Sequence, residues 1–298
     1  FERFIQSFPR LSDLAKSPLD DVLHHWSGLG HYARARNLHK TAVIVTTEYD
    51  GNFPDTVERL VELPGIGRST AGAILAQAEG QRHAILDGNV KRVLARVHTV
   101  HGWTGQAKIQ EQLWAFAEQH TPDKQLADYT QAIMDLGATL CTRSKPDCPD
   151  CPIQQACGAH RQGTVTDYPH SKPKKVLPVR QCVFLMLLGE DGRVLLEQRP
   201  PTGIWGGLWS FPECDQETDL AQWCQQQFNI EIDDYETWQT RRHTFSHFHL
   251  DFTPVMARVA KIIPSVMEPQ DRLWYNTQQP DALGLATPVK RLLNQLGA

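Results

Sequence analysis

Four cysteines stand close together in the stretch "CTRSKPDCPDCPIQQAC", and they constrain the fold more than any other feature of the chain. Cys141, Cys148, Cys151 and Cys157 follow the spacing C-x6-C-x2-C-x5-C within 17 residues. Four thiolates packed this tightly can surround one metal centre. Zinc sites usually use two separated C-x2-C pairs, whereas an iron–sulfur cubane accepts four thiolates from one tight loop. The single C-x2-C pair therefore favours a [4Fe-4S] cluster, with zinc or free thiols as the alternatives.

The composition is that of a globular protein long enough for about two domains. The chain has 298 residues, of which 41% are hydrophobic and 21% charged, and its net charge of −4 does not by itself indicate a nucleic-acid binder. No apolar run approaches the ~20 residues of a membrane span. Seven cysteines and no secretory leader argue against a disulfide framework. Because the sequence starts at Phe1 inside a helical pattern, we expect a fragment whose N-terminal part is missing.

Hydrophobic periodicity divides the chain into a helical part, a linker and a mixed part. Apolar residues recur at three- and four-residue spacing up to about residue 140, and this pattern predicts helices. The ranges are 19–30, 35–49, 56–63, 68–80, 89–100 and 108–120. Residues 159–177 are polar, contain proline and lack periodicity, so we expect a linker there. The sequence thus predicts a helical domain over 1–158 and a second domain over 178–298.

The second domain has the pattern of an α+β fold. Residues 181–189 and 193–199 flank "EDG", which is typical of a β-hairpin, and 247–259 alternates like another strand. Residues 218–228 and 287–296 have the spacing of amphipathic helices. Strands and helices in this order predict an α+β domain.

A glycine-rich turn and an acid follow each other in the helical part. In "LPGIGRSTAGAIL", the turn Leu63–Pro64–Gly65–Ile66–Gly67 joins two helices, where glycines permit positive φ and close approach of a phosphate to backbone N–H groups. An αα-hairpin that needs glycine only to turn is the alternative. Twenty residues later, Asp87 precedes apolar residues at helical spacing and has the signature of an N-cap. Most aspartates in such a position only cap the helix.

Together these motifs resemble a known family. The hairpin followed by a capped helix with an acid resembles the helix-hairpin-helix GPD glycosylase superfamily, and the cysteine spacing resembles its iron–sulfur branch, which contains endonuclease III and the MutY-type enzymes. The stretch "RPPTGIWGGLWSFPE" resembles the opening of a Nudix-like domain, and "RHTFSHFHL" matches the Phe-Ser-His motif of MutY-type C-terminal domains. The chain is identified as a member of the MutY-type adenine DNA glycosylases.

The resemblance implies a fold and a reaction. The fold is an all-α helix-hairpin-helix glycosylase domain with a [4Fe-4S] loop, followed by an α+β Nudix-like (MutT-like) domain. The latter recognises 8-oxoguanine without Nudix hydrolysis, because "CDQETDLAQWCQQQF" stands where a hydrolase has a glutamate-rich, magnesium-binding helix. The reaction is hydrolytic removal of adenine from 8-oxoguanine:A or G:A mispairs in double-stranded DNA. Asp87 then stabilises the oxocarbenium-like sugar after the base is extruded from the helix.

The resemblance also assigns roles to other residues. The adenine pocket is lined by Ser69, Asn89 and Gln131. The damaged base is contacted by Leu29, His31, Tyr32, Phe245, Ser246 and His247. A monomer in the bacterial cytoplasm, associated with the nucleoid and not with a membrane, is expected.

Two departures from the family pattern bear on activity, and the residue at position 69 separates two branches of the superfamily. The family usually has Tyr where this chain has His31, and the smaller, titratable ring predicts damage discrimination that is weaker or depends on pH. The strand-cleaving branch has a lysine at the position of Ser69, so Schiff-base chemistry lacks its nucleophile here, although Lys91 leaves weak imine formation open. The family's general-acid glutamate precedes the first residue of this sequence. An endonuclease III-like lyase and an impaired, damage-binding fragment therefore stand as alternatives.

Overall fold

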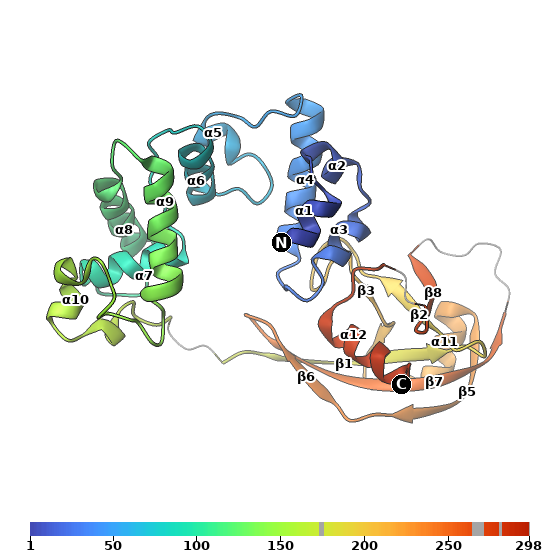
Figure 1. The fold of residues 1–298 in the computed structure, drawn as a ribbon. Coiled ribbons are helices and arrows are strands. Elements are labelled where there is room, and N and C mark those ends of the chain that lie inside the picture. Colours follow the sequence, from blue (N-terminus) through green and yellow to red (C-terminus); the bar gives the residue numbers. More distant parts are fainter. Residues whose placement is uncertain (173–175, 264–270, 280–281, 298) are drawn as a thin grey trace. The chain divides into compact units, whose positions relative to one another are not determined.

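A computed structural model describes residues 1–172, 176–263, 271–279 and 282–297. By their contacts these residues form two compact units, which Figure 1 shows as a mainly helical part and a part that contains the sheet. The first unit combines Phe1–Val43 with Val176–Ala298, and the second is Ile44–Lys175. Within the described residues, no helix is long and apolar enough to cross a membrane.

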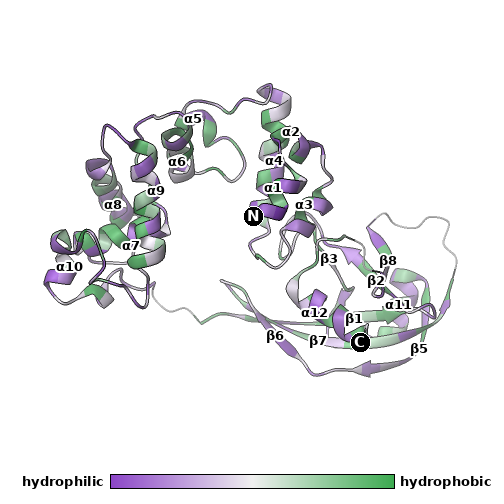
Figure 2. Cartoon of the chain, viewed as in Figure 1, coloured by the Kyte–Doolittle hydropathy of each residue, from purple (hydrophilic) through white to green (hydrophobic). Residues whose placement is uncertain are grey.

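The second unit is a bundle of helices around one apolar core. The helices are α5 (Val57–Leu60), α6 (Arg68–Ala78), α7 (Gly88–Val97), α8 (Ala107–His120), α9 (Leu126–Asp135) with a π-helical turn at Leu136–Leu140, and α10 (Gly158–Arg161). The core gathers residues such as Val90 and Leu94 of α7 with Leu113 of α8. Apolar and polar residues alternate along these helices (Figure 2). This is the amphipathic pattern from which the helices were predicted.

The first unit packs short helices onto a mixed β-sheet. The helices are α1 (Glu2–Ser7), α2 (Leu11–Lys16), α3 (Leu19–His25), the start of α4 (Ala33–Glu48), α11 (Leu220–Phe228) and α12 (Thr287–Leu296). The strands are β1 (Val179–Leu188), β2 (Arg193–Gln198), β3 (Trp209–Ser210), β4 (Glu213–Cys214), β5 (Ile230–Thr237), β6 (Arg241–Thr244), β7 (His249–Ile262) and β8 (Arg272–Asn276). The main order is β3-β2-β1-β7-β5, with β1 and β7 parallel. The predicted hairpin is confirmed, since β1 and β2 are antiparallel with Leu188 opposite Val194.

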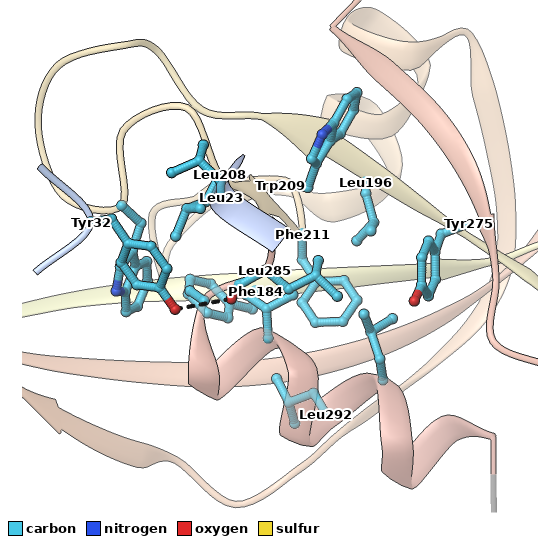
Figure 3. Close-up of a cluster of buried hydrophobic side chains, with 14 of the residues drawn as sticks. Leu23, Tyr32, Phe184, Leu196, Leu208, Trp209, Phe211, Tyr275, Leu285 and Leu292 are labelled. Atoms are coloured by element: carbon cyan, nitrogen blue, oxygen red, sulfur yellow. Dashed lines mark hydrogen bonds between the residues drawn. The ribbon is translucent and has the colours of Figure 1, made fainter. Parts of the chain in front are cut away.

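Both faces of the central strand β1 are buried, which explains its continuous apolar run. Phe184 and Met186 belong to one hydrophobic cluster, and Leu185 and Leu187 belong to the other, because successive side chains alternate between faces. Figure 3 shows the first cluster, in which residues of β1, β2 and α12 meet side chains from the N-terminal helices. Cys224 of α11 lies in the second cluster.

The contacts differ from the predicted domain boundaries at two places. Residues 1–43, expected in the helical domain, pack with 176–298, because apolar residues such as Leu23 are buried in the same cluster as Leu208 (Figure 3). The prediction of an irregular linker from 159 is wrong for its first part: α10 forms there and Tyr168 is buried. Of the expected linker, residues 173–175 lie outside the described residues.

Candidate functional site

Asp87 caps helix α7 with one carboxylate oxygen. The residue is extended (φ −82°, ψ −175°), and its Oδ1 accepts a hydrogen bond from the Val90 N–H at 2.8 Å. The predicted N-cap is confirmed. Among the described residues this cap is the only hydrogen bond of the side chain, so Oδ2 is left to act on a group outside the helix. The side chain is half-buried at the N-terminal end of α7.

Ser69 and Asn89 make hydrogen bonds close to Asp87 in the chain. The Ser69 hydroxyl, from α6, accepts a hydrogen bond from the Leu86 N–H at 2.9 Å and so holds the segment that leads into Asp87. The Asn89 side-chain oxygen accepts from Arg92 Nη2 at 2.8 Å. The assignment of both residues to the adenine pocket stays a prediction.

Gln131 is placed at a different contact, between α6 and α9. Its amide nitrogen donates to Asp135 Oδ1 at 2.8 Å, and its amide oxygen accepts from Gln77 Nε2 at 3.1 Å. The residue is exposed and makes no hydrogen bond with Asp87 among the described residues. Its assignment to the adenine pocket therefore stays a prediction.

The turn between α5 and α6 has one glycine in the left-handed region. Gly65 has φ +81°, a conformation that glycine permits, whereas Gly67 has φ −98° and serves as the N-cap of α6. Leu63 is buried, and its carbonyl accepts from the Ile66 N–H at 3.2 Å, which closes the turn. No atom lies within 4 Å of a Cβ built on Gly67, so the start of α6 is open to an approaching group.

The four predicted cluster cysteines line one small, apolar cavity. Cys141, Cys148, Cys151 and Cys157 all contribute to its wall. Burial raises the pKa of the Cys148 thiol, and the three neighbouring thiols raise it further, which shows how closely the four are grouped. Among the described residues, no three His, Cys, Asp or Glu side chains are placed around one point as a single metal ion requires.

A buried arginine, which the sequence analysis did not single out, ties this loop to α7. Arg96 is only 1% exposed, and its Nη1 donates to Cys141 Sγ at 3.2 Å. Its guanidinium also donates to the carbonyl oxygens of Val165, Tyr168, Thr142 and Arg143. The sequence feature that could have revealed this role is the position of Arg96, three residues after Val93 on the apolar face of a helix. A charged side chain that is buried there needs hydrogen-bond partners.

A second candidate site is a cavity of about 1130 Å³ within the first unit. The loop at 29–33 forms one side, and residues 243–248 form another. Leu29 is 65% exposed and His31 is exposed with φ +49°. Tyr32 is buried, and its hydroxyl donates to the Leu285 carbonyl at 3.3 Å (Figure 3), so it forms part of the wall and does not project outward.

The Phe-Ser-His motif is divided between the interior and the surface of this cavity. Ser246 and His247 are exposed, and the Ser246 hydroxyl lies 3.3 Å from His247 Nδ1. Phe245 is half-buried, with its ring stacked on Phe248 (4.7 Å, 20°) and tilted against Trp205 (5.2 Å). The structure thus brings together the two halves of the predicted damage-recognition set, but it places Phe245 in a packed aromatic group.

Two family models match the chain. Residues 1–137 match the model of the HhH-GPD superfamily base excision DNA repair proteins, and residues 183–295 match the NUDIX domain. The fold and these matches define a base excision DNA repair protein with a Nudix-like domain.

Relatives identify the family more narrowly. An adenine DNA glycosylase of Buchnera aphidicola (subsp. Acyrthosiphon pisum) is 38% identical over 293 residues, which cover 98% of this chain and 83% of the relative. The human adenine DNA glycosylase is 29% identical, with 97% of this chain and 63% of the relative covered. A solved structure of a thermostable thymine-DNA glycosylase is 26% identical over 54% of this chain and 74% of its own, with a TM-score of 0.45. The chain belongs to the adenine DNA glycosylase family.

Proposed function

We propose that this protein removes adenine from 8-oxoguanine:A and G:A mispairs in double-stranded DNA by hydrolysis of the N-glycosyl bond. Membership of the adenine DNA glycosylase family supports the activity. The observation that carries the proposal is the carboxylate of Asp87, held by its cap on Oδ1 at the start of α7. The alternatives of a lyase or a damage sensor are not favoured by these relatives.

The chemistry follows from where positive charge develops. As adenine leaves, the deoxyribose ring becomes oxocarbenium-like, and an ionised carboxylate close to it stabilises that charge before water attacks. Asp87 is fixed before the reaction by the Val90 N–H, and Ser69 fixes the segment in front of it. The rigid support means that little reorganisation is needed when the charge appears.

The amines near the site favour hydrolysis over strand cleavage. Position 69, on α6, carries a hydroxyl that accepts from the Leu86 N–H, and it is not an amine. The nearest amine along the helix, Lys91 Nζ, donates to Gln110 Oε1 on α8 at 3.3 Å. With a hydroxyl at position 69, the amine that strand cleavage would need as its Schiff-base nucleophile is absent there, and Lys91 leaves only weak imine formation open.

The cysteine loop fits a [4Fe-4S] cluster held by Cys141, Cys148, Cys151 and Cys157. A cubane separates its four ligands by the width of the cluster, so the thiols surround a cavity and need not meet at one point. The buried guanidinium of Arg96, whose partners are carbonyls and one thiol, is suited to a site of net negative charge. The bound cluster would order the loop. Cys148→Ser should lose iron and sulfide, about four of each per chain, whereas Cys214→Ser, outside the loop, should keep them.

The cavity of the first unit is proposed as the site that reads 8-oxoguanine. Ser246 and His247 supply exposed groups that can hydrogen-bond to a base edge, and the loop with Leu29 and His31 supplies exposed side chains on the facing side. We expect Ser246→Ala to lower the preference for 8-oxoguanine:A over G:A.

The decisive experiment is single-turnover adenine release by the complete natural protein and its Asp87→Asn variant. Asparagine keeps the N-cap but loses the charge, so the rate should fall by roughly 10²–10³ or more while the fold is kept. Asp219→Asn is a matched control, because Asp219 caps α11 through the Gln222 N–H in the same way. If Asp87→Asn releases adenine as fast as Asp219→Asn, Asp87 is only a cap and the proposed mechanism is wrong.

A further inference from the structure

A tryptophan with a left-handed backbone lies beside the proposed recognition cavity. Trp205 has φ +51° and is 8% exposed. A non-glycine residue in this region is strained and persists only where its surroundings hold it there. Such strain often marks a place where a side chain must point in one direction.

The loop around Trp205 is closed by backbone hydrogen bonds. The Trp205 carbonyl accepts from the Leu208 N–H at 2.9 Å, and the Ile204 carbonyl accepts from Arg199 Nε at 3.1 Å. A Cβ on Gly206 would lie 2.6 Å from the Pro201 carbonyl oxygen, so only glycine fits next to Trp205. These contacts fix the backbone and therefore the direction of the Cα–Cβ bond of Trp205.

The indole ring of Trp205 packs against two aromatic side chains, those of His243 on β6 and of Phe245 just after β6. His243 and Phe245 project from the same side of the chain, and their ring centroids lie 5.3 Å and 5.2 Å from that of Trp205. His243 and Phe245 also contact each other edge to face at 4.7 Å. Burial, with the nearby Arg291, lowers the pKa of His243, so its ring is neutral at pH 7 and packs like an aromatic side chain.

Phe245 is thereby held between two aromatic rings. Trp205 lies on one side of it, and Phe248 stacks on it at 4.7 Å with an interplanar angle of 20°. The next two residues, Ser246 and His247, are the exposed ones. A ring packed in this way anchors the turn, and it is not free to enter a base stack.

The same loop also supports the facing side of the cavity. Arg36 of α4 donates from Nη1 to the Gly206 carbonyl at 2.7 Å, and α4 begins directly after the loop that contains His31. Residue 205 thus contacts Phe245, and its neighbour at 206 contacts the helix that follows the loop with Leu29 and His31.

We propose that Trp205 is a positioning residue for lesion discrimination: its ring holds Phe245 and His243 so that Ser246 and His247 are presented to the damaged base. This inference rests on the proposed function of the cavity. It assigns Phe245 the role of an anchor for the turn, in place of the direct contact with the damaged base that the sequence analysis expected.

The test compares the ratio of single-turnover adenine release from 8-oxoguanine:A and from G:A duplexes at subsaturating protein. A general loss of folded protein lowers both rates alike, so the ratio reports positioning and not stability. We expect Trp205→Leu to lower the ratio by about tenfold, since two aromatic pairs are lost. Trp205→Phe keeps an aromatic ring under His243 and Phe245, so its ratio should stay within about threefold of that of the unsubstituted protein.

The matched control is Trp223→Leu. Trp223 packs edge to face on Phe228 at 5.0 Å in the hydrophobic cluster on the other face of the sheet, so the same substitution should leave the ratio unchanged. If Trp205→Leu does not fold, the same ratio is measured for His243→Leu. A lowered ratio supports the proposal, and an unchanged ratio overturns it.

The outcomes separate this inference from the function on which it rests. If Ser246→Ala lowers the ratio and Trp205→Leu does not, Trp205 has no positioning role and the recognition cavity stands. If neither variant changes the ratio, the assignment of the cavity to 8-oxoguanine is itself wrong.

Discussion

Replacement of Arg96 by methionine should release the segment that follows the cysteine loop. The guanidinium is 1% exposed and donates to four carbonyl oxygens at 2.8 to 3.2 Å. Methionine has a similar length and no donor, so the buried acceptors lose their partners. Two of these acceptors, Val165 and Tyr168, belong to the segment, so at about 1 kcal/mol for each its local stability should fall by about 2 kcal/mol. Since 1.4 kcal/mol is a factor of ten, opening should become roughly 30 times more frequent.

Hydrogen exchange of the peptide 158–168 measures this opening directly. The Thr164 N–H donates to the Ala159 carbonyl at 2.9 Å, so its exchange rate reports whether the segment is closed. Arg161→Met is the matched control, because Arg161 is exposed in the same segment and should change the rate by less than about threefold. If Arg96→Met also accelerates exchange less than about threefold, the carbonyl contacts contribute little and the reasoning is refuted.

Three further predictions concern titratable and reactive groups. Burial raises the pKa of the Cys182 and Cys224 thiols to about 12, so maleimide at pH 7.5 should label neither in the folded protein and both after denaturation, which mass spectrometry can check. Burial and His120 lower the pKa of His98 from 6.5, so on acidification the unfolded state binds the proton before the folded state does. The free energy of unfolding should therefore be highest above pH 6.5 and fall below it. Urea titrations should show a smaller loss at low pH for His98→Phe. His31→Tyr should raise binding to 8-oxoguanine:A at pH 8, because a larger ring stacks over more area; equal affinities would show that residue 31 does not stack.

Local patterns were sufficient to predict much of the chemistry. Asp87 precedes apolar residues at helical spacing, and the N-cap is found as expected because capping depends only on the first turn of the helix. The turn at Gly65 and the grouping of the cysteines followed from short spacings for the same reason. These features depend on residues within about twenty positions of each other.

Features that depend on long-range packing were not predicted. The sequence pattern around Tyr32 predicts an exposed loop, but its hydroxyl donates a hydrogen bond to the Leu285 carbonyl, 253 residues away. Tyr168 stands in a polar, proline-containing stretch, and its burial depends on Arg96, which draws the backbone of that stretch onto α7. In both cases the deciding partner is a backbone carbonyl or a guanidinium whose position no local pattern reports.

The two proposed sites draw on different compact units, so their defects should be separable. Asp87 and its supports belong to the second unit, and Trp205 with the Phe-Ser-His turn belongs to the first. Loss of the carboxylate removes a contribution that both mispairs need, so it lowers both rates and leaves their ratio unchanged. Loss of the indole changes the ratio, because only one of the two mispairs carries the 8-oxo group. In the double variant the two effects should multiply, and a departure from that product would show that lesion reading also sets the geometry at Asp87.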